Sequence, residues 1–368
     1  MEIIKQKITK NKNFKFVYIP LLGAKHHGGV RIIFLIANFL AKKEFKVTII
    51  CHSSAWKPIY PLSEKVKVKL INSKFFIFYL LKLYLFLTFN CKKESLCILS
   101  HWITGALYSL VPKSLRTKSL YFVQDSEEVF YNKKNILGKL IRFFVFYSYK
   151  NASKSFVVTT KYGFRKLKNI LKKRTSKIEL IPLGIDENVF FVDKNFKKQN
   201  KVIFFPRKGW FKGFELLREI LNDLINKESL KNFNFYLISQ EYQLQDFLPK
   251  SNRIKFFSIS SDYDLRRIYN EAKLLVHTSK YEGICLPILE SIKCGTFVIL
   301  TNSFGPLTYS KKINSHVFLK RDKTLICDEI ENYLLNFKNN SIEISDSVSR
   351  YTLDNFLNSF TNKLNAMY

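Results

Sequence analysis

The sequence predicts an α/β protein with two doubly wound domains. Its 368 residues are more than a single domain of ordinary size contains. Short apolar runs rich in Val, Ile and Phe alternate with longer helical patterns. A polar, unpatterned stretch at 191–200 interrupts this alternation, which then restarts. We therefore expect a first domain over 1–190, a linker over 191–200, a second domain over 201–345, and a helix in 346–368 that packs back toward the first domain.

The expected elements follow in chain order. The first domain has strands at 15–19, 46–51, 97–100, 119–124 and 155–159, with helices at 30–43, 101–111, 137–150 and 160–172. The second has strands at 201–206, 234–239, 254–259, 274–278 and 296–301, and 346–366 has an amphipathic helical pattern. Continuous apolar strands are typical of parallel sheets covered by helices, and such sheets bind ligands beyond the carboxyl ends of their strands. We expect the site in the strand-to-helix loops, facing a cleft between the domains.

The net charge of +32 is concentrated in the first half of the chain. Residues 1–190 contain 35 Lys and Arg against 10 Asp and Glu, whereas the remainder contains 26 against 19, so the two parts carry +25 and +7. A surface this basic attracts a phospholipid surface, a phosphorylated lipid carrier or a nucleic acid. The alternative is a solvated surface in a lysine-rich composition.

Cysteine spacing and hydropathy bear on the compartment. The six cysteines form no CxxC pair and have no metal-ligand spacing with histidines, so we expect a reduced, cytoplasmic protein.

The apolar run 14–22 is short, contains Lys15 and lacks a cleavage site, which favours a first strand over a signal peptide. The run 75–89 is broken by Lys82 and is shorter than the roughly 20 residues that span a bilayer. This run and the basic aromatic stretch 133–150 are either core helices or helices on an anionic membrane surface.

The clearest candidate site follows the strand 274–278, where Glu282 to Glu290 reads EGICLPILE. Pro287 fits only near a helix start. The amino end of that helix would be formed by the backbone amides of Gly283, Ile284, Cys285 and Leu286. A helix amino terminus suits a diphosphate, and carboxylates accept hydrogen bonds from sugar and ribose hydroxyls. Two ordinary helix glutamates are the alternative.

Two further loops have features that suit phosphate binding. Arg207 and Lys212 follow the first strand of the second domain and could stabilise a departing diphosphate, although a basic pair is also common on surfaces. Gly28 and Gly29 follow the first strand of the chain and would let backbone amides approach a phosphate.

The passage from Leu265 to Ile299 resembles the signature of retaining GT-B glycosyltransferases, the glycosyl transferases group 1 or family 4 type. The two glutamates with seven residues between them, the Cys-Gly that follows, and Arg207 five residues before Lys212-Gly all match that pattern. The resemblance implies two Rossmann-like domains facing a cleft, with a nucleotide-sugar donor on the second and a glycan or lipid-linked acceptor on the first. It implies hexosyl transfer with retention and without a metal ion or other cofactor.

The resemblance also assigns roles to individual residues. Arg207, Lys212 and Glu282 would be catalytic, and the donor would contact a second set of residues. That donor-binding set is Gly28, Gly29, Gly283, Ile284, Cys285, Leu286 and Glu290. The pair Asp262 and Asp264 could suggest a metal site but precedes a helix as capping residues do.

The sequence departs from the family pattern after the strand 119–124. Many relatives carry a histidine there, whereas this chain has Gln124 and Asp125, which resembles a rhamnosyltransferase-like branch. We expect Gln124 and Asp125 to take the place of that histidine in the acceptor or sugar pocket. His101 could enter the acceptor pocket or pack in a loop, and the roles of His26 and His27 stay open.

The predicted function is glycosyl transfer in bacterial surface polysaccharide or glycolipid assembly, in the cytoplasm and peripherally on the inner face of the membrane. Nucleic acid is not expected as a partner. The alternatives are a nucleotide-sugar epimerase on the same fold, which needs no acceptor, and a basic protein that only binds membranes or polyanions.

Overall fold

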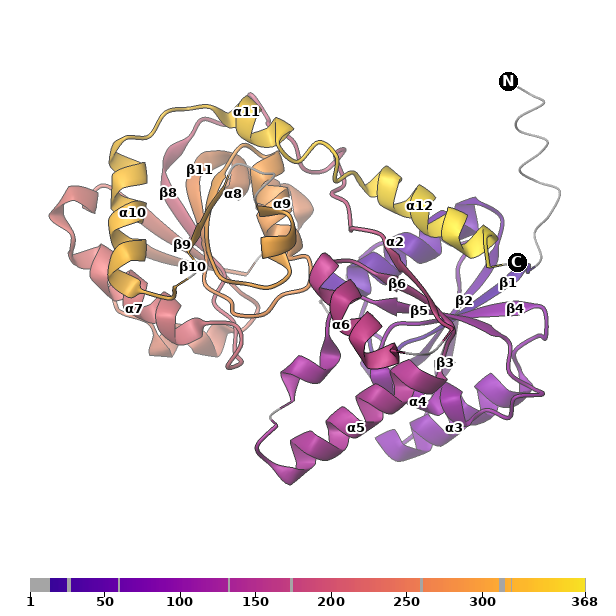
Figure 1. Cartoon of the computed structure of the whole chain (residues 1–368). Helices are drawn as coiled ribbons and strands as arrows, with labels where there is room; N and C mark the ends of the chain where they lie inside the picture. Colours follow the sequence, from indigo (N-terminus) through magenta and orange to yellow (C-terminus); the bar gives the residue numbers. More distant parts are fainter. Residues whose placement is uncertain are drawn as a thin grey trace, which may run out of the picture. The chain divides into compact units, whose positions relative to one another are not determined.

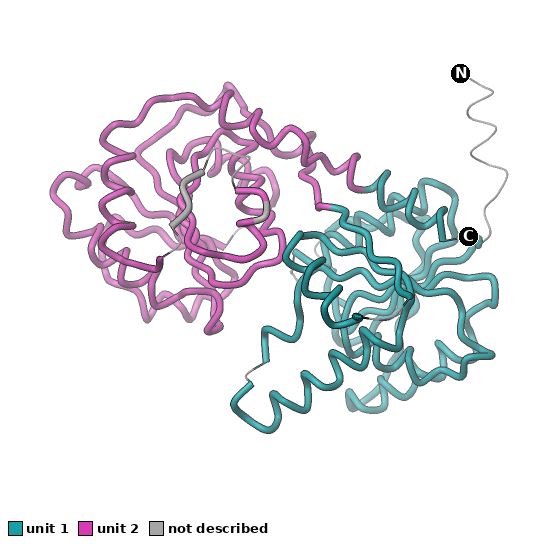
Figure 2. The backbone as a smooth tube through the Cα atoms, in the orientation of Figure 1, with its two compact units in different colours: residues 1–181, 357–368 teal, residues 182–356 magenta. Residues whose placement is uncertain are grey.

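The computed structural model describes residues 14–24, 28–58, 60–131, 133–172, 175–258, 261–310, 315–318 and 320–367. The chain divides into two compact units, one formed by 1–181 with 357–368 and the other by 182–356 (Figure 2). The predicted linker, 191–200, falls within the second unit. His26 and His27 lie outside the described residues.

The first unit contains a seven-stranded parallel sheet within the described residues (Figure 1). Its order is β3 (Lys67–Ile71), β2 (Lys46–His52), β1 (Phe16–Pro20), β4 (Ser95–Leu99), β5 (Lys118–Val123), β6 (Ser155–Val158) and β7 (Lys177–Leu180). The connecting helices are α2 (Gly28–Lys42), α3 (Phe76–Phe89), α4 (Trp102–Leu110), α5 (Ile136–Asn151) and α6 (Lys161–Leu171).

The second unit contains a six-stranded parallel sheet within the described residues. Its order is β10 (Ile254–Phe257), β9 (Asn234–Ile238), β8 (Gln199–Phe204), β11 (Ala272–His277), β12 (Phe297–Thr301) and β13 (Ser315–Phe318). Its helices are α7 (Phe214–Asn226), α8 (Asp262–Glu271), α9 (Leu286–Lys293), α10 (Lys323–Leu335) and α11 (Ser341–Asp346). The prediction of an α/β fold with two doubly wound sheets is confirmed.

The central strands are the ones that the sequence predicts, because their apolar runs are buried on both faces. β1, β4, β5, β8, β11 and β12 supply most of the buried strand positions. The prediction missed β3, β7 and β13, each at an edge of its sheet. In β3 and β7, exposed lysines and a glutamate break the apolar run, so neither resembles a buried parallel strand.

Several helix boundaries differ from the prediction. The final helix, α12, runs over Leu353–Asn365 and therefore starts later than the predicted residue 346. Its Phe360 packs edge-on against Phe122 of β5, with ring centroids 5.5 Å apart, and Lys363 pairs with Glu179 of β7 at 3.1 Å. At α8, Ser261 is the cap and its hydroxyl accepts from the Asp264 amide.

Within the part of the chain that the structure describes, no helix is both long and apolar enough to cross a membrane. The helix α3 has 14 residues.

Candidate functional site

The predicted donor residues meet where the strand order of the second sheet reverses. After β8 the chain continues to β9 on one side, and it later returns to place β11 on the other. Loops that leave β8 and β11 therefore diverge above a crevice, which is the usual ligand position in an open parallel sheet. The first of these loops carries Arg207 and Lys212, and the second carries Glu282.

Lys212 and Glu282 form an ion pair across this point, with Lys212 Nζ 2.9 Å from Glu282 Oε1. The two side chains are only 16% and 14% exposed, so the pair lies in a partly desolvated place. Arg207 is exposed, but its charge also acts on Glu282. The prediction that these three residues share a site agrees with this arrangement, while their catalytic roles stay predictions.

The protonation states around Glu282 follow from its neighbours. Burial raises the pKa of Glu282, but Lys212, His277 and Arg207 together outweigh burial and hold the pKa below its ordinary value. The buried His277 lies 4.0 Å from the same carboxylate, and burial lowers its pKa to about 4. At neutral pH, His277 is therefore neutral and Glu282 is ionised.

Hydrogen bonds from side-chain hydroxyls to backbone carbonyls hold the two loops together. The Thr278 hydroxyl donates to the Gly213 carbonyl at 3.1 Å, and the Ser279 hydroxyl donates to the Lys212 carbonyl at 3.2 Å. Gly213 has φ +69°, and a Cβ there would lie 2.0 Å from the Thr278 carbonyl oxygen. Only glycine permits both this conformation and this close approach.

The helix after Glu282 is short. It has eight residues, begins at Leu286 and has Pro287 in its first turn, and Cys285 precedes it with φ +57°. Glu282 thus lies in the loop before the helix, and Glu290 lies about one turn inside it. The amides of Gly283 to Leu286 are placed at the helix start, as predicted.

Glu290 does not lie beside Glu282 in a shared ion-pair cluster. It is buried on α9, and the Tyr269 hydroxyl of α8 donates to its carboxylate at 3.5 Å. Its predicted contact with a ribose would have to be made from this buried position.

The atoms of His277, Glu282 and Cys285 also group closely, with their possible metal-ligating atoms within 4.8 Å of one another. However, Lys212 already binds the carboxylate of this group. Burial raises the pKa of the Cys285 thiol well above its ordinary value.

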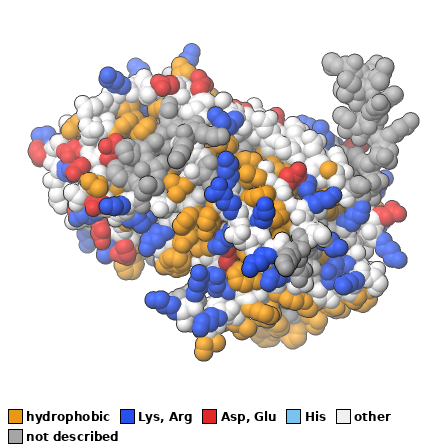
Figure 3. Space-filling view, viewed as in Figure 1, with side chains coloured by type: hydrophobic (Ala, Val, Ile, Leu, Met, Phe, Trp, Pro, Cys, Tyr) orange, Lys and Arg blue, Asp and Glu red, His pale blue; other side chains and the backbone are white. Residues whose placement is uncertain are grey.

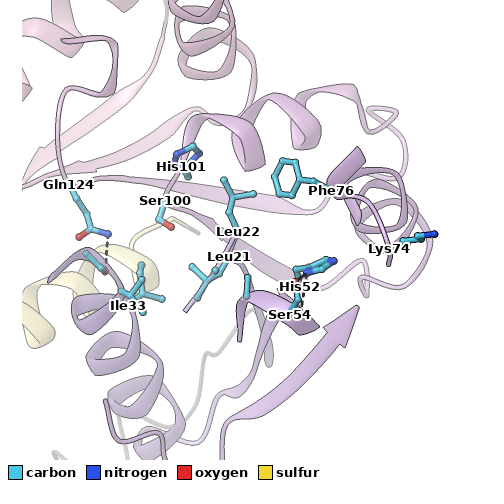
Figure 4. Close-up of a pocket in the computed structure, with 14 residues that line it drawn as sticks. Leu21, Leu22, Ile33, His52, Ser54, Lys74, Phe76, Ser100, His101 and Gln124 are labelled. Carbon is cyan, nitrogen blue, oxygen red and sulfur yellow. Dashed lines mark hydrogen bonds between the residues drawn. The ribbon is translucent and has the colours of Figure 1, made fainter. Parts of the chain in front are cut away.

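The first unit has its own cavity at the corresponding position. The strand order of its sheet reverses between β1 and β4, and a cavity of about 610 Å³ opens at the carboxyl ends of these strands (Figure 4). Its lining includes Gly29, His52, Lys74, His101 and Gln124. Figure 4 places Gln124 and Lys74 at opposite ends of the labelled residues.

Three predicted residues line this cavity, and two do not. The Gln124 side-chain amide donates to the Gly29 carbonyl at 3.2 Å, which joins β5 to the start of α2, and His101 lies beside them. Gly28 begins α2 but is not in the lining, and the Asp125 carboxylate accepts from the Ser126 amide at 2.7 Å outside the cavity. Gln124, rather than Asp125, therefore faces the cavity.

The His101 side chain caps a helix and also lines the cavity. Its Nδ1 accepts from the Ile103 amide at 3.2 Å and so caps α4, while the ring lines the cavity. Burial lowers its pKa to about 4. Because Nδ1 accepts a hydrogen bond, the proton of the neutral ring is on Nε2, which is therefore the donor of this side chain.

The sequence did not point to His52, Lys74 or His277. His52 bridges two loops through hydrogen bonds to Ser54 Oγ at 2.7 Å and Ser73 Oγ at 2.9 Å. Each of these residues ends or closely follows a strand, which is the one signal that could have identified them.

A comparison with known families supports a glycosyltransferase. Residues 186–340 match the family model described as Glycosyl transferases group 1. One component of the human phosphatidylinositol N-acetylglucosaminyltransferase is 21% identical over 183 residues, covering 46% of this chain and 36% of that protein. The aligned part thus spans about a third of that relative.

Solved structures share the fold over nearly the whole chain. A sucrose-phosphate synthase from Thermosynechococcus elongatus superposes with a TM-score of 0.78 at 15% identity, covering 96% of this chain and 99% of that one. WaaG, a glycosyltransferase involved in lipopolysaccharide biosynthesis, gives 0.73 at 14% identity with 94% and 98% coverage. Anabaena HepE, solved in complex with UDP-glucose, gives 0.72 at 12% identity with 95% and 99% coverage. The two parallel sheets with flanking helices match GT-B glycosyltransferase structures.

Proposed function

We propose that this protein transfers a hexosyl group from a nucleoside-diphosphate sugar to an acceptor hydroxyl, with retention of the anomeric configuration. The observation that carries the proposal is the pairing of Lys212 with Glu282 at the reversal point of the second sheet, within the segment that matches the family model. Cations there suit a diphosphate, and a carboxylate suits a sugar hydroxyl. Arg207 and Lys212 would supply the positive charge, so no metal ion or other cofactor is needed.

The proposed chemistry assigns each group a task. As the bond between the sugar C1 and the diphosphate oxygen breaks, negative charge grows on the diphosphate and is stabilised by Arg207 and Lys212. Glu282 accepts hydrogen bonds from sugar hydroxyls. The acceptor oxygen bonds to C1 on the same face, and its proton passes to the departing phosphate oxygen. Burial lowers the pKa of His277 to about 4, so its neutral ring is a weak base for the acceptor proton.

The relatives support a nucleotide-sugar donor and a role in surface polysaccharide or glycolipid assembly. HepE is solved with UDP-glucose, and WaaG acts in lipopolysaccharide biosynthesis. We propose a cytoplasmic enzyme that works peripherally at the inner membrane face, in keeping with the basic first half of the chain. A rhamnose-type deoxyhexose donor is included in the proposal because of Gln124 and Asp125.

The test starts with the donor. Nucleoside-diphosphate sugars that carry uridine, guanosine or thymidine are screened for protection against thermal unfolding, with each free nucleotide as control. We expect one donor to raise the Tm more than its nucleotide. If no member of the panel does so, the donor assignment is wrong.

The linkage of the product then tests the stereochemistry. NMR of the anomeric proton should show the configuration of the donor, and an inverted product would overturn retention. If the protein converts the nucleotide sugar to an isomer when no acceptor is present, the alternative of a nucleotide-sugar epimerase is favoured.

A further inference from the structure

Three side chains with metal-ligating atoms meet at the end of β11. His277 is the last residue of this strand, and Glu282 and Cys285 lie in the loop that follows it. Their ligating atoms lie within 4.8 Å of one another, and the described residues contain no second group of three such side chains. The fold thus brings an imidazole, a carboxylate and a thiol together, although the sequence shows no metal-ligand spacing between cysteines and histidines.

The His277 ring nitrogen Nε2 is close to both of the other groups. It lies 3.8 Å from Cys285 Sγ and 4.0 Å from Glu282 Oε1. Zinc bonds nitrogen and oxygen at about 2.1 Å and sulfur at about 2.3 Å, so neighbouring ligands of a tetrahedral ion are about 3.4–3.6 Å apart. Each pair therefore has to close by only about 0.6 Å or less. Because Cys285 Sγ also lies 4.0 Å from Nδ1, the ring must turn for its lone pair to point at a shared ion.

The backbone of the loop holds Cys285 in an unusual conformation. Cys285 has φ +57°, which is strained for a residue with a Cβ and is usually adopted by glycine. The buried Tyr309 hydroxyl donates to the Ile284 carbonyl at 2.6 Å and so fixes the preceding residue. Gly305 lies against the Gly283 carbonyl so closely that a Cβ there would clash with it. Strained residues that are fixed by their surroundings in this way are common in ligand sites.

The surrounding charges select the kind of ion that can bind. The positive charges of Lys212, Arg207 and Arg321 reach His277. The chain has a net charge of +32, and Figure 3 shows Lys and Arg side chains spread over the visible face of the molecule. Such surroundings repel a hard cation that is held mainly by charge, as Mg²⁺ is. Zn²⁺ forms strong bonds to thiolate and imidazole, so the composition of this group favours zinc over magnesium.

We propose that His277, Glu282 and Cys285 bind a zinc ion and that this ion inhibits the enzyme. The inhibition rests on the proposed function, whereas the binding does not. The three protein ligands are a His277 ring nitrogen, a Glu282 carboxylate oxygen and the Cys285 sulfur, and water is the fourth ligand. The thiol releases its proton to solvent as its sulfur bonds to the ion.

Zinc and the proposed donor compete for the same carboxylate. Lys212 Nζ lies 2.9 Å from Glu282 Oε1, and in the proposed reaction Glu282 accepts hydrogen bonds from the sugar. An ion on this carboxylate takes it away from both partners and occupies the place of the sugar hydroxyls. Zinc therefore acts as a reversible inhibitor that raises the KM for the donor.

Cobalt(II) is the probe for the binding step, because it accepts the same ligands as zinc and is coloured. The full chain is freed of metals with EDTA, kept reduced, transferred to buffer without EDTA and titrated with cobalt chloride. We expect a thiolate-to-cobalt charge-transfer band in the near ultraviolet together with the strong visible bands of a four-coordinate ion. Zinc chloride should remove both. Weak visible bands without charge transfer would show an adventitious ion only and would overturn the proposal.

Two substitutions remove the thiol in different ways. Cys285→Ser keeps the size of the side chain, whereas Cys285→Gly suits the left-handed backbone, so the test does not depend on the folding of one variant. Each should weaken zinc binding at least about 100-fold, because the loss of even an outer-shell partner costs about 10- to 100-fold. Cys91→Ser is the matched control, since Cys91 is also partly buried, and it should bind zinc like the wild type. A charge-transfer band that persists in both Cys285 variants would contradict the assignment.

Turnover measures the inhibition. The rate of each variant in zinc is divided by its own rate in EDTA, so that a direct effect of the substitution cancels. We expect zinc to inhibit the wild type, excess donor to relieve the inhibition, and Cys285→Ser to need at least about 100-fold more zinc. Magnesium chloride should have no effect. Equal zinc sensitivity of the wild type and Cys285→Ser, or activation by zinc, would overturn the inhibitory role.

The two proposals fail in different ways. The cobalt spectrum is recorded without donor, and donor protection against thermal unfolding is measured in EDTA. If a donor protects the protein but no charge-transfer band appears, the zinc site is wrong and the transferase proposal stands. If the band appears but no donor protects, zinc binding stands and the proposed function fails.

Discussion

At the scale of single residues, neutral buried histidines link stability to pH. Both His277 and His101 have a pKa lowered to about 4 by burial, against an ordinary value of about 6.5. Between these values the unfolded chain binds protons that the folded chain does not. Stability therefore decreases as the pH falls from about 6.5 to 4, by about 1.4 kcal/mol per pH unit for each histidine.

Urea unfolding at several pH values measures this effect. His277→Asn and His101→Asn should each flatten the pH dependence, and the double variant should flatten it most. The lowered pKa of Glu282 acts in the same direction at lower pH, since its contribution is lost as the carboxylate is protonated. A stability that is constant across this window would contradict the assignment.

The positive charge of Lys212 should also affect the turnover of the enzyme. Lys212→Ala should reduce turnover about 100- to 1,000-fold, because a cation that faces the developing diphosphate charge is lost. Lys201 offers a matched control, since it pairs with Glu271 at 2.5 Å and the two side chains are 13% and 15% exposed, close to the values for Lys212 and Glu282.

Lys201→Ala should lower stability about as much as Lys212→Ala and leave turnover unchanged. Steady-state rates and urea midpoints of both variants provide the comparison. Equal loss of turnover in both would show that the effect of Lys212 is structural.

At the scale of elements, one glycine lets two loops approach. Gly213→Ala should destabilise the protein by about 1–3 kcal/mol, because a left-handed residue acquires a Cβ that meets the Thr278 carbonyl. Gly28→Ala is the matched control, since its Cβ would meet nothing within 4 Å. Chemical denaturation should show a change for Gly28→Ala of at most about 1 kcal/mol. Equal losses of stability in the two variants would contradict the close approach of Gly213 to the Thr278 carbonyl.

Most of the final helix, from Leu357 onward, belongs to the first unit despite its place in the chain. Phe360→Ala should cost about 3–5 kcal/mol, because the ring is buried against Phe122. Phe89→Ala removes a ring that is 70% exposed and should change stability by about 0.5 kcal/mol or less. Denaturant unfolding of the two variants decides whether α12 stabilises this unit.

At the scale of the whole molecule, the sequence predicted the fold class and the central strands. Apolar runs such as Phe297 to Thr301 stand out because buried parallel strands need apolar side chains on both faces. The edge strands β3 and β7 could not be recognised, since they are largely exposed and their lysines and glutamate interrupt the apolar run.

The composition of the candidate site was also readable in part. Arg207, Lys212 and Glu282 were identified from their spacing together with the family resemblance. Gly29 was identified from its place after the first strand, and Gln124 from the departure from the family pattern. His277, His52 and Lys74 were not, because a residue near the end of a strand becomes a site residue only through the neighbours that the fold supplies. Asp125, the neighbour of Gln124, was expected at the ligand and lies outside the cavity.

By itself, the sequence determined which residues carry charge and which segments alternate between strand and helix. The order of the strands was decided only by the tertiary structure, because local patterns do not say which strands are neighbours. That order places β8 beside β11 and so brings Lys212 to within 2.9 Å of Glu282, from 70 residues away along the chain. The same reason holds in the first unit, where β1 beside β4 creates the cavity at His101 and Gly29.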